Sequence, residues 1–166
     1  MHQFSTTIAI HAAPERVRAV MVDVDRWPEW TESIRRVQRL DDGPLAVGAR
    51  ARVFQPGLPP AVWQVTALDE GGFTWVSRAP GVTVTGDHRV AGADGVSQAT
   101  LSIRYEGPLG GVLAWLTRGV NDRYIGMEAA GLKRRRAARS LLPGHAPTQR
   151  PRAHRDLLGR GGPEHA

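Results

Sequence analysis

The hydrophobic period of this chain changes once, at Gly107-Pro108. Between Ile34 and Gly107, short alternating segments are separated by turn residues, whereas after Pro108 apolar residues recur at intervals of three and four. A period of two is typical of strands, and intervals of three and four are typical of a helix. Because no helical pattern interrupts the alternating region, its strands must pair with their sequence neighbours through short hairpins. The chain is therefore constrained to an antiparallel meander followed by one long helix.

The alternating region predicts six strands. They lie at 35–41, 49–55, 62–69, 72–79, 82–90 and 96–106. One more strand precedes them, because Phe4, Thr6, Ile8 and Ile10 alternate on one face. Between that strand and the meander we expect two short helices.

The first short helix should run from Pro14 to Val22, since proline is tolerated at the first helical position. The second should run from Pro28 to Ser33, because Pro28 pushes Trp27 out of helical space. The apolar stripe of the long helix consists of the following residues: Leu109, Val112, Leu113, Leu116, Val120, Tyr124, Met127 and Gly131. The elements together predict an α+β fold in which seven strands wrap one long helix.

The charge of the chain is concentrated at its C-terminal end. The formal net charge is +6, but residues 1–132 carry −1 and residues 133–166 carry +7. Residues 141–166 are rich in Arg, Pro, Gly and His and lack apolar periodicity, so we predict a disordered basic tail after a single domain at 1–140. The chain has no cysteine, signal-peptide pattern or membrane-spanning stretch, and we expect a cytoplasmic protein.

Alternate residues of a strand lie on the same face of the sheet, so the apolar residues of each strand identify the side chains that face the long helix. His88 shares a face with Val82, Val84 and Val90, and Tyr105 shares one with Leu101 and Ile103. Aromatic side chains with a few polar groups are the usual composition of a small-molecule site. The predicted ligand-binding residues are Trp30, Trp63, Phe73, Trp75, His88, Tyr105, Leu113, Leu116, Val120 and Tyr124. In the strand at 62–69, Trp63, Val65 and Ala67 are expected on one face.

His88 has three interpretations: a hydrogen-bonded core histidine, a ligand contact, or a general acid or base. No carboxylate partner for it is evident in the sequence. The other five histidines do not form a metal-ligand spacing with His88, and no phosphate-binding loop is present, so we predict neither a metal nor a cofactor.

Two further segments remain open to more than one interpretation. Trp27-Pro28-Glu29-Trp30 is either a packing plug at the open end of the sheet or a gate at the entrance to a cavity. Lys133-Arg134-Arg135-Arg136 and Arg139 form either a solvated helix end or a nonspecific contact to nucleic acid or anionic lipid.

Several stretches resemble the START-like (SRPBCC) superfamily, specifically bacterial polyketide cyclase/dehydrase-type proteins. They are Ala13 to Val17, Val22 to Ile34 with its Trp-Pro-Glu-Trp block, Trp75-Val76, Ala79 to Gly81, Asp87 to Val90, Tyr105 to Leu109, Tyr124 and Met127 to Lys133. The resemblance covers most of residues 4–138. It implies a helix-grip fold, in which a curved seven-stranded antiparallel sheet surrounds the C-terminal helix and an internal cavity, and it supports the inward position of His88.

Three functions follow as hypotheses. The first is binding, with or without transport, of a small hydrophobic ligand such as a lipid, polyketide or quinone. The second is a cyclase/dehydrase-type reaction, in which His88 deprotonates or polarises a carbonyl compound and Tyr105 donates a hydrogen bond. The third is an adaptor for nucleic acid or a membrane surface that acts through residues 133–166. Ligand identity and oligomeric state are not encoded in any motif.

Overall fold

The computed structural model describes residues 2–140, and the side chains of residues 2–135. Its elements are, in chain order, β1 (His2–Ile10), α1 (Pro14–Val22), the 3₁₀ helix η1 (Val24–Glu29), β2 (Arg36–Arg39), β3 (Arg50–Phe54), β4 (Ala61–Asp69), β5 (Gly72–Ala79), β6 (Val82–Ala93), β7 (Val96–Glu106) and α2 (Gly110–Ser140). The predicted tail at 141–166 lies outside the described residues.

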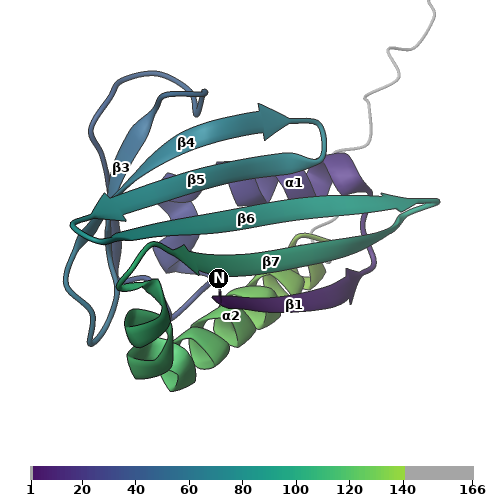
Figure 1. The fold of residues 1–166 in the computed structure, drawn as a ribbon. Coiled ribbons are helices and arrows are strands. Elements are labelled where there is room, and N and C mark those ends of the chain that lie inside the picture. The colour runs from purple at the N-terminus through teal and green to yellow at the C-terminus, as the bar shows by residue number, and fades with distance from the viewer. Residues whose placement is uncertain (1, 141–166) are drawn as a thin grey trace, which may run out of the picture.

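The seven strands form one antiparallel sheet in the order β1-β7-β6-β5-β4-β3-β2. The six strands of the meander pair with their sequence neighbours, as their spacing predicted, and β1 closes the sheet by pairing along β7. Figure 1 shows the sheet curving over α2, with α1 at the opposite end from the first turns of α2. The predicted helix-grip architecture is confirmed.

The second short helix lies earlier than predicted. It is a 3₁₀ helix that begins at Val24 and ends at Glu29, so the expected range of Pro28 to Ser33 was wrong. Asp23 ends α1, and the Arg26 amide donates to the Asp23 carbonyl at 3.1 Å, which starts the tighter turn at once. The Trp27 indole Nε1 then donates to the Met21 carbonyl at 3.0 Å and ties the turn to the end of α1.

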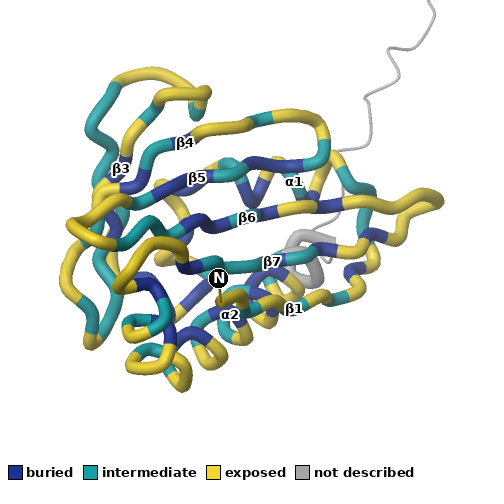
Figure 2. The backbone as a smooth tube through the Cα atoms, viewed as in Figure 1, coloured by how far each residue is buried: buried dark blue, intermediate teal, exposed yellow. Residues whose placement is uncertain are grey.

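Burial follows the predicted alternation in β1 and β7, and the predicted inward positions of β5 and β6 are at least half-buried, but Val76 in β5 and Thr85 in β6 are buried as well although they belong to the opposite face. In β4 the alternation itself shifts. Trp63 and Val65 are buried, but Ala67 is exposed although it was expected on their face. The pairing of β4 with β5 shifts between Val65 and Ala67, so Thr66 is an extra residue and Leu68 takes the next inward position. Figure 2 shows buried positions along the middle of β5, β6 and β7, whereas the hairpin between β6 and β7 is exposed.

The face that α2 presents to the sheet agrees only in part with its apolar stripe: Leu113 and Tyr124 line the interior cavity and Gly131 is buried, but other members of the stripe face outward. Leu109, Val112 and Leu116 are exposed, which contradicts the stripe at these positions. The fully packed positions of α2 are Ala114, Asn121, Ile125, Ala129 and Leu132. Small residues allow the helix to approach the rest of the fold closely: a Cβ on Gly131 would lie 2.0 Å from the Trp30 carbonyl oxygen. Periodicity identified the helix, but close packing determined its rotation.

Candidate functional site

An interior cavity of about 200 Å³ lies between the sheet and α2. Its walls come from β3 to β7, from the loop between β3 and β4, and from four successive turns of α2. The side chains contributed by α2 are Leu113, Thr117, Asn121, Tyr124, Ile125 and Glu128. The loop contributes Leu58, which is half-buried, and Pro59, which is exposed. The cavity therefore reaches the surface beside this loop.

One wall of the cavity is aromatic. The His88 ring stacks on Phe73 at a centroid distance of 4.7 Å with an interplanar angle of 2°, because the two residues face each other in the pairing of β5 with β6. Trp75 meets His88 edge-on at 5.7 Å and packs against Trp63 at 5.1 Å. The Trp75 indole lies over Gly86, where a Cβ would be 2.6 Å from Nε1. A glycine at this position is what leaves room for the indole against β6.

His88 lies next to a carboxylate that sequence reasoning did not identify. Its Nε2 is 3.7 Å from Glu128 Oε2, while its Nδ1 is buried and has no hydrogen-bond partner among the described residues. The other Glu128 oxygen, Oε1, accepts a hydrogen bond from the Ser33 hydroxyl at 3.0 Å, and the Thr31 hydroxyl lies 2.8 Å from that of Ser33. Two buried hydroxyls thus hold the carboxylate beside the imidazole.

The spacing on α2 could have revealed Glu128. Asn121, Tyr124, Ile125 and Glu128 recur at intervals of three, one and three, which places them on one helical face. Tyr124 was expected to face inward, so Glu128, one turn later, should have followed. The apolar stripe did not include Glu128 because it was drawn from apolar residues alone.

Tyr105 belongs to a second polar cluster. Its hydroxyl donates to Asn121 Oδ1 at 3.0 Å, Asn121 Nδ2 donates to Thr117 Oγ1 at 3.0 Å, and Thr117 Oγ1 donates to the Leu113 carbonyl at 2.7 Å. His88 lies opposite Leu101 in the pairing of β6 with β7. Tyr105 is four residues further along β7, so its Cα atom is about 13 Å from that of Leu101 along the strand. The polar groups therefore occupy two separate parts of the cavity wall. A joint action of His88 and Tyr105 on one atom does not fit this spacing.

Six of the ten predicted contact residues line the cavity: Trp63, Trp75, His88, Tyr105, Leu113 and Tyr124. Phe73 is fully buried behind His88, Leu116 is 64% exposed, and neither they nor Val120 belong to the lining. Leu116 and Val120 follow the outward rotation of α2 described above. Among the described residues, no three potential metal-ligating side chains gather.

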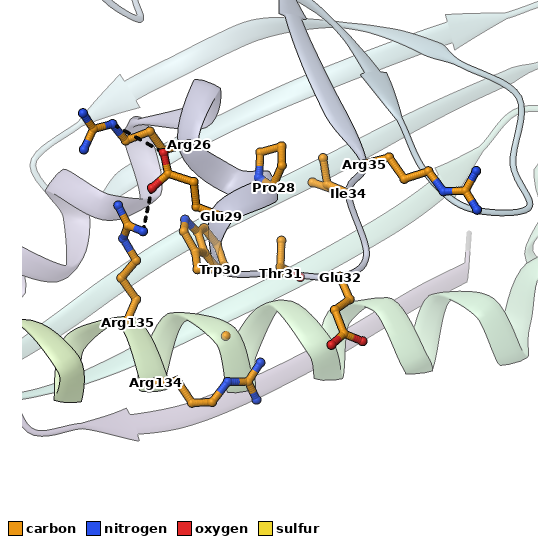
Figure 3. Close-up of a pocket in the computed structure, with 11 residues that line it drawn as sticks. Arg26, Pro28, Glu29, Trp30, Thr31, Glu32, Ile34, Arg35, Arg134 and Arg135 are labelled. Atoms are coloured by element: carbon orange, nitrogen blue, oxygen red, sulfur yellow. Dashed lines mark ion pairs between the residues drawn. The ribbon is translucent and has the colours of Figure 1, made fainter.

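Trp30 lines a different and larger feature, a groove of about 880 Å³ on the outside of the protein. Figure 3 shows this groove between η1 and the late turns of α2, with the Arg135 guanidinium directed at Glu29. Its lining includes Arg26, Arg35 and Arg134 and is mostly polar, so it is unsuited to an apolar ligand. Trp30 packs at 5.9 Å against the buried Trp27, which itself lines the interior cavity. The two tryptophans thus form a packed plug in this structure.

The comparisons with known proteins decide the family. Residues 1–136 match the family described as polyketide cyclase / dehydrase and lipid transport. The chain belongs to this family. The START-like resemblance is thereby confirmed, and the domain is a hydrophobic ligand-binding or polyketide cyclase-like one. No curated protein matches the sequence.

Solved structures share the fold. The Zhui aromatase/cyclase from Streptomyces sp. R1128 is 16% identical with a TM-score of 0.70, covering 86% of this chain and 98% of that one. A START superfamily protein from Mycobacterium smegmatis is 14% identical with a TM-score of 0.61, covering 81% and 99%. The di-domain aromatase/cyclase BexL from the BE-7585A biosynthetic pathway is 22% identical with a TM-score of 0.61, covering 81% of this chain. The alignment spans only 46% of BexL.

Within the described residues, none of the helices is long and apolar enough to cross a membrane.

Proposed function

We propose that the protein binds a compact, ring-shaped apolar ligand in the interior cavity. The observation that carries the proposal is an interior cavity of about 200 Å³ whose wall includes two packed tryptophans and a histidine. Sites for drug-sized ligands usually measure about 300–1,000 Å³, whereas an apolar cavity of about 150 Å³ holds one benzene ring. A ligand of one or two rings therefore fits better than a long-chain lipid or a large polyketide.

The polar groups of the wall favour a ligand that carries oxygen. The buried Nδ1 of His88 has no partner among the described residues, and an unpaired buried polar atom is destabilising unless water or a ligand satisfies it. A hydroxyl or carbonyl group on an aromatic ring would supply that partner. The proposed ligand class is therefore small hydroxy- or oxo-aromatic compounds, including quinones.

A size series tests this proposal. Native mass spectrometry and calorimetry with phenol, 1-naphthol and a four-ring hydroxy-aromatic compound should give the tightest binding for 1-naphthol. The variant Val84→Phe adds a ring to the cavity wall and should weaken binding of 1-naphthol, while the matched variant Val62→Phe, on an exposed position of β4, should not. Equal binding by both variants, or no binding of any of the three compounds, would refute the proposal.

A second candidate function is acid–base catalysis on the bound ligand, favoured by the 3.7 Å approach of Glu128 to His88. Neutral His88 would accept a proton from the carbon next to a carbonyl, and Glu128 would stabilise the imidazolium that forms. The ligand is left as an enolate, the imidazolium exchanges its proton with D₂O, and a deuteron then returns to the same carbon. Exchange of the methyl protons of 4-hydroxyacetophenone in D₂O, followed by ¹H NMR, should be accelerated by the protein and lost in His88→Gln.

The exchange assay separates the two proposals. Binding of 4-hydroxyacetophenone without acceleration would reject catalysis and leave ligand binding intact. The adaptor role of residues 133–166 and the cytoplasmic location stay predictions from the sequence.

A further inference from the structure

The first two turns of α2 carry an exposed apolar surface. Val112, Trp115 and Leu116 are 58%, 75% and 64% exposed, and Leu109, directly before the helix, is 53% exposed; we call these four residues the helix tip. They are four of the seven large hydrophobic side chains that are exposed among the described residues, and they lie within eight positions of one another. Isolated exposed apolar residues are ordinary, but a contiguous cluster marks an interaction surface.

The packing of α2 explains why the tip is left uncovered. Ala114 is buried against the sheet, and Leu113 and Thr117 of the same turns line the cavity, so the remaining positions point outward. Figure 2 shows exposed positions along the outer side of these first turns. The tip adds nothing to the core or to the cavity wall. Its apolar character therefore calls for a partner outside the described fold.

Positive charge borders the tip. Arg118 and Arg123 follow it on α2 and are exposed, and neither has an ion pair among the described side chains. Exposed Arg78 lies at the end of β5, three residues before Gly81, whose backbone packs against Leu109. The acidic groups of this region are Asp122, exposed on α2, and Glu106, which is 3.6 Å from Arg104.

We propose that the helix tip docks on the surface of an anionic phospholipid bilayer. Trp and Leu at the level of the headgroups, bordered by arginines, form the usual pattern of a helix that binds a membrane interface. Anionic lipid also complements the arginines. A second copy of the chain is the less suitable partner, because a contact of the tip with itself would bring together two surfaces that are both bordered by arginines, and like charges repel.

Docking would also place the cavity near the bilayer. Leu113 and Thr117 line the cavity from the same two turns that carry the tip. The docking itself does not depend on the ligand, so its test is carried out without one.

The test is flotation of the full chain with vesicles of phosphatidylcholine, alone or mixed with phosphatidylglycerol. Wild type should float with the mixed vesicles, and the double variant Trp115→Asp/Leu116→Asp should lose about tenfold or more of this binding. Both positions are solvent-exposed, so circular dichroism should show an unchanged fold. The matched double variant Val47→Asp/Val62→Asp, at exposed valines away from the tip, should float like wild type.

Quenching by brominated lipid identifies the part of the chain that touches the membrane. Tryptophan fluorescence should be quenched in wild type and much less in Trp115→Phe, because the other tryptophans are less exposed. Flotation that survives the Trp115→Asp/Leu116→Asp change would place the contact elsewhere, for example in residues 133–166, and would overturn the proposal. A concentration-dependent dimer in light scattering that the same change abolishes would overturn it in favour of a second copy.

Discussion

Gly86 on β6 provides a sharp test of the aromatic wall. The Trp75 indole lies directly over this glycine, and an added Cβ would be 2.6 Å from its Nε1 and 2.9 Å from its Cδ1. Ordinary van der Waals contact begins at 3.4 Å. In the variant Gly86→Ala the indole must therefore move by about 0.8 Å, away from β6.

The loss of stability expected for Gly86→Ala depends on how tightly the Trp75 side chain is packed. Trp75 is 95% buried and has aromatic neighbours at 5.1 to 5.7 Å, including Trp63 and His88, so the cavity that it lines is the free space beside it into which it can shift. Overpacking of this kind typically destabilises by about 1–3 kcal/mol. For a protein of this size a loss of about 2 kcal/mol lowers the Tm by about 4–8 °C. The displaced ring and the new methyl group should also narrow the cavity and weaken binding of 1-naphthol.

The assay is thermal unfolding followed by near-ultraviolet circular dichroism, with Gly119→Ala as the control. Gly119 lies on α2, and a Cβ there would meet nothing within 4 Å. Since Ala is a better helix former than Gly by about 1 kcal/mol, this change should raise the Tm. The two substitutions are chemically identical but should act in opposite directions. A Gly86→Ala protein as stable as wild type would show that the wall is not packed as described.

Three further substitutions test other contacts. Gly131→Ala should lower the free energy of unfolding in urea by about 3 kcal/mol, because the added Cβ would lie 2.0 Å from the Trp30 carbonyl oxygen. A loss smaller than about 1 kcal/mol would contradict this packing. Tyr105→Phe should lose about 1–3 kcal/mol by the same measurement, because it leaves the buried Asn121 Oδ1 without its donor; an unchanged midpoint would show that this bond is not formed. Hydrogen bonds from Arg50 hold the pKa of the Asp41 carboxyl below its ordinary value of 3.8. The ionised carboxylate therefore stabilises the fold above pH 3.8, and this contribution is lost as the pH falls through the lowered pKa. Asp41→Asn should therefore unfold at lower urea than wild type near neutral pH but not in strong acid, and a difference that persists in acid would contradict the assignment.

The strands and the long helix were predictable because local pattern determines them. Alternation and turn residues placed all six strands of the meander within a few residues of their observed bounds, and the change of period at Gly107-Pro108 placed the helix. The second short helix was misplaced, because Asp23 starts a 3₁₀ turn that hydropathy does not reveal. The bulge between Val65 and Ala67 was missed for a similar reason, since register depends on the partner strand.

The site was predictable on the sheet and only in part on the helix. A side chain in a strand faces one of two sides of the sheet, and the alternation correctly predicted that His88 and Tyr105 face the interior. A helix can rotate continuously, and the apolar stripe gave a wrong face at Leu116 because it counted hydrophobic residues as buried. Glu128 and Asn121 were missed for the complementary reason: their polar groups are satisfied by partners distant in sequence, which no local pattern indicates.

The most direct test of the account is a crystal structure of the protein grown with 1-naphthol. The account predicts electron density for the two fused rings inside the cavity, against the Trp75 indole and beneath Leu113 of α2, with the naphthol oxygen close to a polar group of the wall. Density confined to the outer groove beside Trp30, or an empty cavity at saturating 1-naphthol, would contradict the central claim.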